Sequence, residues 1–229
     1  MRILVVGVNQ GLGLVLSEML AERGHTVFAG YRDPQSAAAA EAARRYPDYR
    51  PVRLDVVDEG MAVSAARRIA SDGGALQAVV LVAGTLKDSD RELLVTDADI
   101  GDLRAALDTN VVGSAVVIKH FHALVEDGGL FLVITSEAGS MANVGTKYPA
   151  YSITKSAQNK LVAVFAKTVP RLKVYAVHPG RMNTVMGRND AQIEPETAAL
   201  GIVSILSGER IIPQENGWFI DYRGEAMRI

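Results

Sequence analysis

The sequence predicts an α/β protein with one doubly wound, mostly parallel sheet, which we expect to have seven strands between two helix layers. Short aliphatic runs alternate with helical patterns about four times within the first 90 residues. A glycine-rich turn joins the first aliphatic run directly to the first helical pattern. We find no linker, repeat or low-complexity segment, so residues 1–229 are expected to form a single domain.

Composition narrows the classes of function. With 48% hydrophobic and 22% charged residues the chain has a globular balance, and a net charge of −2 gives no footprint for nucleic acid or membrane. The absence of cysteine excludes disulfides, thiolate metal sites and a cysteine nucleophile. His120 and His122 would point in different directions on a helix, so no metal site is expected.

Targeting signals are not expected either. The first apolar run ends at Asn9-Gln10, which is too short for the core of a signal peptide. No later apolar run approaches the length that spans a membrane. The sequence therefore predicts a cytoplasmic protein.

The first predicted unit is a buried strand at residues 3–6, a glycine-rich turn, and a helix at residues 14–23. In this context the glycines would let backbone N–H groups at the helix start approach a phosphate, as in the Rossmann fold. The alternative is a tight turn that needs glycine for backbone reasons only. The turn contains Gly7, Asn9, Gln10, Gly11, Leu12 and Gly13.

The second predicted strand, residues 26–31, ends where a dinucleotide fold meets the adenosine ribose. An acid there accepts the 2′-hydroxyl of NAD, whereas an arginine accommodates the 2′-phosphate of NADP. The chain has Tyr31 and Arg32 at this point, which favours NADP(H) over NAD(H). Asp33 is expected to cap the following helix, residues 35–45, with Pro34 in its first turn.

The remaining elements continue the alternation. Strands are expected at residues 52–54, 78–82, 130–135, 173–177 and 218–222, with helices at 61–71, 100–126, 151–168 and 195–206 and a loop at 85–97. Asp55-Val56, Ala83-Gly84 and Ser136 follow three of these strands. Ligands bind at this edge of a parallel sheet, although a serine at a strand end can also have no function.

Tyr151 and Lys155 are four residues apart and share one face of the predicted 151–168 helix. A lysine ammonium beside a phenol favours the phenolate and would lower the tyrosine pKa toward neutrality. The alternative is a surface lysine near a partly buried tyrosine. Asn110 lies inside the predicted 100–126 helix, where an asparagine is usually a surface residue.

Together these residues resemble the short-chain dehydrogenase/reductase family over essentially the whole chain. The matches are the glycine turn with Val6 in place of threonine, Asp55, the Asn110-Val111-Val112-Gly113 segment, Ser136, the Tyr151/Lys155 pair, and Pro179-Gly180 with Thr184. The short chain and the Gly217-Trp218 ending resemble the C-factor and sniffer-like carbonyl reductase branch.

The resemblance implies an NADP(H)-dependent oxidoreductase that moves a hydride between the nicotinamide and a small carbonyl or alcohol substrate. Tyr151 would be the general acid/base, Lys155 would lower its pKa and hold the ribose, Ser136 would bond the substrate oxygen, and Asn110 would anchor a relay water. The implied cofactor site comprises Gly7, Asn9, Gln10, Gly11, Leu12, Gly13, Tyr31, Arg32, Asp55, Val56, Ala83, Gly84, Asn110, Tyr151, Lys155, Pro179, Gly180, Met182 and Thr184.

The chain departs from the family pattern at Leu81 and Val82, which replace two asparagines. Two other functions remain open: an NADPH-binding sensor without turnover, and a sugar-nucleotide epimerase. The Tyr-Lys pair disfavours the sensor, and the glycine spacing and short chain disfavour the epimerase.

Two further expectations concern partners. Apolar residues beyond what one face can bury predict a homodimer or homotetramer through the helices around Asn110 and Tyr151: Val111, Val112, Val116, Val117, Leu161, Val162 and Phe165. Met141, Met182 and Met186 suggest an adaptable apolar wall for the substrate, or equally filler beneath a loop.

Overall fold

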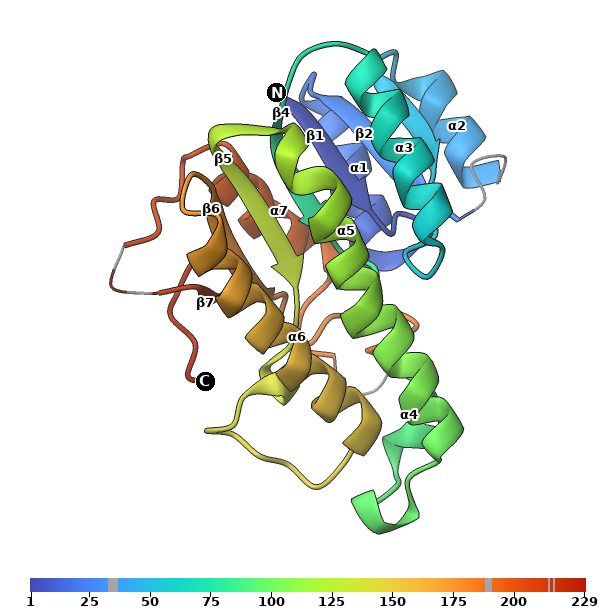
Figure 1. Cartoon of the computed structure of the whole chain (residues 1–229), viewed down its shortest axis with the longest axis vertical. Coiled ribbons are helices and arrows are strands. Elements are labelled where there is room, and N and C mark those ends of the chain that lie inside the picture. Colours follow the sequence, from blue (N-terminus) through green and yellow to red (C-terminus); the bar gives the residue numbers. More distant parts are fainter. Residues whose placement is uncertain (33–36, 188–190, 214, 216) are drawn as a thin grey trace.

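Seven strands of the described chain run parallel in one sheet, in the order β3-β2-β1-β4-β5-β6-β7 (Figure 1). The structure is a computed structural model that describes residues 1–32, 37–187, 191–213, 215 and 217–229. The predicted sheet is confirmed. Its strands are β1 Arg2–Val6, β2 Thr26–Tyr31, β3 Tyr49–Arg53, β4 Leu76–Leu81, β5 Val125–Ile134, β6 Lys173–His178 and β7 Phe219–Asp221.

Helices cover both faces of the sheet. The α-helices are α1 Gly11–Glu22, α2 Ala37–Arg45, α3 Glu59–Ser71, α4 Ile100–Leu107, α5 Gly113–Phe121, α6 Pro149–Thr168 and α7 Pro195–Leu206. Short helical turns are η1 Ser89–Arg91, η2 Val95–Asp97, η3 Asp108–Val112, η4 His122–Leu124 and η5 Glu137–Gly139. The expected Asp33 cap and Pro34 lie outside the described residues.

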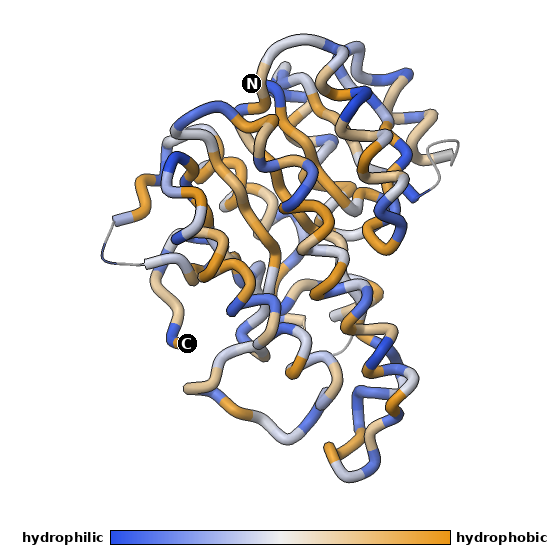
Figure 2. The backbone as a smooth tube through the Cα atoms, viewed as in Figure 1, coloured by the Kyte–Doolittle hydropathy of each residue, from blue (hydrophilic) through white to orange (hydrophobic). Residues whose placement is uncertain are grey.

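The strands are mostly apolar where both of their faces are buried, and their charged residues lie near the strand ends (Figure 2). In β1, Ile3 and Val5 point into a core formed with α1, α2 and α7. Leu4 and Val6 point the other way, into a core formed with α3, α5 and α6. The two-residue repeat of a strand thus serves two separate cores.

The helix expected over residues 100–126 is wrong in its extent. Helix α4 ends at Leu107, the π-helical turn η3 follows, and α5 ends at Phe121. Strand β5 already begins at Val125, five residues before the expected start at 130. Gly128 has a φ of +80° inside β5, and the pairing of β5 with β4 shifts register near it.

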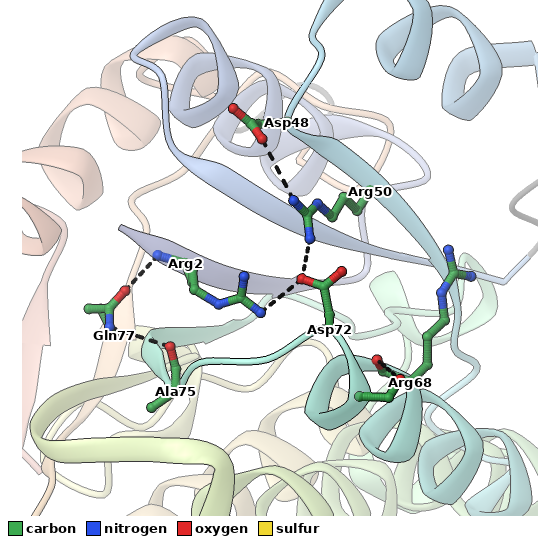
Figure 3. A network of polar contacts seen from close by, with 8 residues as sticks. Arg2, Asp48, Arg50, Arg68, Asp72, Ala75 and Gln77 are labelled. Carbon is green, nitrogen blue, oxygen red and sulfur yellow. Dashed lines mark hydrogen bonds and ion pairs between the residues drawn. The ribbon is translucent and has the colours of Figure 1, made fainter.

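A network of ion pairs lies at the amino-terminal edge of the sheet (Figure 3). Asp72, after α3, forms ion pairs with Arg2 of β1 and Arg50 of β3. Both guanidinium groups lie over the Phe28 ring, 5.1 and 5.6 Å from its centroid. This network joins β1, β2, β3 and α3 at the edge opposite the strands' carboxyl ends.

The connections that follow the strands gather at the other edge. The strand order reverses between β1 and β4, which creates the crevice where open α/β sheets bind ligands. In Figure 1 the segment before α4 and the loop between β5 and α6 lie at the same end of the molecule, beyond the strands. Among the described residues, none of the helices has the length and apolar character needed to cross a bilayer.

Candidate active site

One cavity of about 1930 Å³ occupies the carboxyl edge of the sheet. Its walls come from the residues that follow β1 to β6, so elements far apart in the sequence meet there. From the expected cofactor set it is lined by Gly7, Asn9, Gln10, Gly11, Leu12, Arg32, Asp55, Val56, Ala83, Gly84, Tyr151, Lys155, Pro179, Gly180, Met182 and Thr184. From the expected catalytic set it is lined by Ser136, Tyr151 and Lys155, while Gly13, Tyr31 and Asn110 are not on its walls.

Two glycines of the first turn, Gly7 and Gly13, have no room for a side chain. A Cβ on Gly7 would lie 2.6 Å from the Ala83 nitrogen, and a Cβ on Gly13 would overlap the carbonyl oxygen of Gly7. Gly11 has a φ of +58° and faces the Thr184 side chain. The turn therefore holds the start of α1 against the end of β4, a cradle that fits the diphosphate of a dinucleotide.

The two residues at the end of β2, Tyr31 and Arg32, lie in different environments. Arg32 is exposed and lines the cavity, and its backbone N–H donates to Asn9 Oδ1 at 3.3 Å. Tyr31 is fully buried, with its hydroxyl 2.7 Å from that of Tyr49, which is 2.9 Å from Ser17 Oγ. The structure does not bring the Tyr31 side chain to the cofactor end, because β-strand alternation turns it into the core.

Tyr151 is positioned by the amino terminus of α6. Tyr148 precedes this helix with a φ of +57°, Pro149 has no N–H, and the next two N–H groups need acceptors. The buried Asp90 carboxylate supplies both, accepting from Ala150 N at 2.9 Å and Tyr151 N at 2.8 Å. Asp90 therefore ties the loop after β4 to the residue that carries the phenol.

Ser136 follows β5 and stands beside Tyr151. Its backbone is extended, and its Oγ accepts from Ala138 N at 3.1 Å, which starts the short turn η5. Burial raises the pKa of Tyr151 to about 12, and the Ser136 hydroxyl acts in the opposite direction. The serine and the phenol are thus close enough to act on one atom.

Lys155 is buried one helical turn after Tyr151. Its Nζ lies 5.6 Å from the centroid of the Tyr151 ring and donates to Gln158 Oε1 at 2.7 Å and Ile134 O at 3.1 Å. Burial lowers the pKa of Lys155 to about 7. Burial disfavours the charged form of both groups, and a lowering of the Tyr151 pKa by Lys155 stays a prediction.

Asn110 is fully buried in the π-helical turn η3, not on the helix surface. Its Oδ1 accepts from Thr85 N at 2.8 Å, and its Nδ2 donates to Thr85 O at 3.0 Å and Thr154 Oγ1 at 2.9 Å. A Cβ on Gly84 would lie 3.3 Å from Asn110 Oδ1 and 3.5 Å from Lys155 Nζ. Asn110 therefore joins the segment after β4 to Thr154 of α6, the residue before Lys155.

Sequence reasoning missed two residues that bond to the expected catalytic residues, Asp90 and Gln158. No sequence pattern indicates the role of Asp90, because its partner Tyr151 is 61 residues away. Gln158 could have been found, since an amide three residues after Lys155 lies on the same helix face.

Several exposed apolar side chains line the cavity. Met141 and Val144 are 70% and 75% exposed, and Leu94, Val95, Val185 and Met186 are also exposed there. Polar contacts tie these loops together: Arg91 donates to Met186 O at 2.8 Å, and Lys147 pairs with Glu92 at 2.8 Å. The expected Met141, Met182 and Met186 all line this cavity.

Comparisons with known proteins agree with this geometry. A family model described as enoyl-(acyl carrier protein) reductase matches residues 7–215. The 1-hydroxy-2-glutathionyl-2-methyl-3-butene dehydrogenase of Rhodococcus sp. (strain AD45) is 26% identical, over 95% of this chain and 94% of that protein.

Solved structures give the same result. A short-chain dehydrogenase/reductase from Burkholderia multivorans with bound NADP has a TM-score of 0.86 at 26% identity, covering 100% of this chain and 99% of that one. The carbonyl reductase Sniffer of D. melanogaster has a TM-score of 0.89 at 22% identity, with coverage of 100% and 99%. At that identity the second likeness concerns the fold.

Proposed function

Because the chain belongs to the short-chain dehydrogenase/reductase family, it is an oxidoreductase, and we propose that it reduces small carbonyl compounds with NADPH or oxidises the corresponding alcohols. The observation that carries this proposal is the meeting of Ser136, Tyr151 and Lys155 on one wall of a cavity that also contains the glycine turn. In this proposal residues 1–229 act as one cofactor-binding domain.

The roles follow from the chemistry of the three side chains. A nicotinamide cofactor supplies or takes up the hydride when it is bound. Tyr151 donates a proton to the developing alkoxide in reduction and accepts it in oxidation. Ser136 donates a hydrogen bond to the same oxygen, and Lys155 in its ammonium form stabilises the phenolate that remains.

The cavity suits an apolar substrate. Exposed aliphatic and methionine side chains form part of its lining, and methionine adapts to ligands of different shape. We therefore expect aldehydes, ketones or quinones with apolar substituents to be reduced. The test is loss of NADPH absorbance in a panel of such compounds, and a native protein that binds NADPH but consumes none with any of them would contradict the proposal.

Arg32 is expected to make the protein prefer NADP(H). A guanidinium on the 2′-phosphate forms a charge-assisted, bidentate contact that contributes roughly 1.5–3 kcal/mol. This corresponds to about a tenfold to hundredfold preference over NAD(H). The dissociation constants of NADPH and NADH, measured by fluorescence titration, should become similar in Arg32→Ala.

The control for this prediction is Arg53→Ala. Arg53 is an exposed cation at the end of the neighbouring strand β3, outside the cavity lining. Its removal should leave the preference unchanged. Equal affinities of the native protein for the two cofactors, or a preference that survives Arg32→Ala, would contradict the role of Arg32.

Assembly is proposed to occur through α4, α5 and α6. Of the apolar residues expected there, Val117, Val162 and Phe165 are buried in the core, whereas Val112 of η3 is about half exposed. Two further apolar residues of α6, Ile153 and Val164, are also about half exposed. Light scattering at micromolar concentration should give a mass two or four times 24.5 kDa. A single species of the monomer mass would contradict this prediction.

A further inference from the structure

Lys155 is held by neutral oxygen atoms and not by a carboxylate. The side chain is 3% exposed, and its Nζ donates to Gln158 Oε1 at 2.7 Å and to Ile134 O at 3.1 Å. Among the residues that the structure describes, no acidic side chain bonds to Lys155. The Gln158 amide oxygen is therefore the nearest side-chain dipole that favours the ammonium form.

The orientation of the Gln158 amide follows from its other bond. Gln158 is 0% exposed, and its Nε2 lies 2.7 Å from Ser114 Oγ. The Ser114 hydroxyl donates its only proton to Asn110 O at 2.7 Å, so toward Gln158 it can only accept. The amide nitrogen must face Ser114, which turns the amide oxygen toward Lys155.

The hydrogen-bonded series Lys155–Gln158–Ser114–Asn110 is shielded from solvent. Asn110 and Gln158 are fully buried and Ser114 is 1% exposed. This series of hydrogen bonds runs from Lys155 on α6 to Ser114 on α5 and ends at the backbone carbonyl of Asn110. It therefore does not provide a route for protons to water. Its geometry suits an anchor that fixes the position and the charge of the ammonium group.

Other ionisable groups near α6 are engaged elsewhere. Asp90 on η1 bonds Ala150 N and Tyr151 N, Glu137 on η5 pairs with Arg181, and His178 of β6 accepts from Glu137 N. Tyr151 is the ionisable neighbour on α6 itself. None of the remaining charged residues of η1, α4, η3, α5 and β6 bonds to Lys155: Arg91, Asp102, Arg104, Asp108, Lys119, His120 and Lys173.

We propose that Gln158 is a positioning residue that keeps Lys155 protonated in the buried site and that Ser114 orients Gln158 for this task. The catalytic consequence rests on the proposed function, since a protonated Lys155 stabilises the Tyr151 phenolate. Without the amide oxygen, Lys155 would keep only the Ile134 carbonyl as an acceptor, and less would oppose the effect of burial, which disfavours the ammonium form.

The direct test is an NMR titration of Lys155 in the protein without added cofactor. The ¹³Cε signal of Lys155 is identified by its absence in Lys155→Met and followed against pH. Gln158→Met keeps the length of the side chain but removes the acceptor, and it should lower the midpoint by about one to two pH units. Gln158→Glu should raise it, because a carboxylate favours the ammonium more strongly.

Two further variants make the test specific. Ser114→Ala should lower the midpoint by less than Gln158→Met, because the amide remains but loses the partner that orients it. Asn159→Leu removes a neighbouring buried amide that makes no bond to Lys155, and it should leave the midpoint unchanged. An unchanged midpoint in Gln158→Met, or a shift of the same sign in Gln158→Glu, would overturn the proposal. Should Gln158→Met fail to fold, an unshifted midpoint in Ser114→Ala would overturn it instead.

A second measurement links the anchor to turnover. Activity that needs the charged lysine is lost as pH rises through the Lys155 pKa, so the alkaline limb of carbonyl reduction should move to lower pH in Gln158→Met. An alkaline limb at the same pH in Gln158→Met and in the native protein would contradict this link between the Lys155 charge and turnover. A native protein that reduces no carbonyl would contradict the proposed function alone, because the NMR titration still decides the role of Gln158.

Discussion

Tyr151→Phe is expected to lower turnover by about 10²–10⁴-fold, the usual contribution of a general acid or base. The phenyl ring keeps the packing of Tyr151 at the start of α6, and Asp90 bonds its backbone N–H in either case. Only the hydroxyl beside Ser136 is lost. Steady-state carbonyl reduction and NADPH titration together should therefore show lost turnover with nearly native cofactor binding.

Tyr148→Phe is the matched control for this prediction. Tyr148 lines the same cavity three residues earlier, immediately before α6. Its substitution should change turnover far less than that of Tyr151. If Tyr151→Phe retains native activity, or if the loss belongs to Tyr148→Phe, the assignment of Tyr151 as the proton donor is wrong.

Gly13→Ala is expected to have a large effect on folding and on cofactor binding. The added methyl group would overlap the carbonyl oxygen of Gly7 and lie 2.9 Å from its carbonyl carbon. Both atoms belong to the backbone, so relief requires the turn to move away from Ala83 and the end of β4. Overpacking costs about 1–3 kcal/mol and more where the backbone must shift, so we expect the free energy of unfolding to fall by about 3 kcal/mol.

Gly11→Ala provides a comparison within the same turn. Its methyl group would meet only the Thr184 side chain, at an ordinary 3.5 Å, although the φ of +58° imposes a cost of about 1–2 kcal/mol. Urea unfolding at equal protein concentration should give a lower free energy of unfolding for Gly13→Ala than for Gly11→Ala. NADPH titration should show lost binding in Gly13→Ala, and the reverse ranking would mean that the turn tolerates the movement.

The ion pairs of Asp72 at the amino-terminal edge should be less sensitive to substitution than the glycine turn after β1. Asp72 joins Arg2 and Arg50 at partly exposed positions, where water screens ion pairs and each contributes little. The glycine turn is constrained by backbone atoms that cannot move independently. Sensitivity to substitution should therefore concentrate at the carboxyl edge of the sheet, where the cavity lies.

Much of the fold was determined by local sequence patterns. Aliphatic runs with glycine and proline boundaries marked the strands, and a strand buried on both faces has few other solutions. The same patterns placed Gly7, Ser136 and Tyr151 at one edge, because the carboxyl ends of parallel strands meet there. The spacing of Tyr151 and Lys155 gave their shared helix face without any tertiary information.

Only the tertiary structure decided where several side chains point and what they bond. Tyr31 turns into the core toward Tyr49, Asn110 is buried against Thr154, and Gln158 reaches Ser114 on another helix. The early start of β5 and the Asp90 bond to Tyr151 also join segments distant in the sequence. Periodicity fixes which face a residue occupies, but long-range packing decides which partner meets it there, and in this site those partners set the charge of Lys155 and the position of Tyr151.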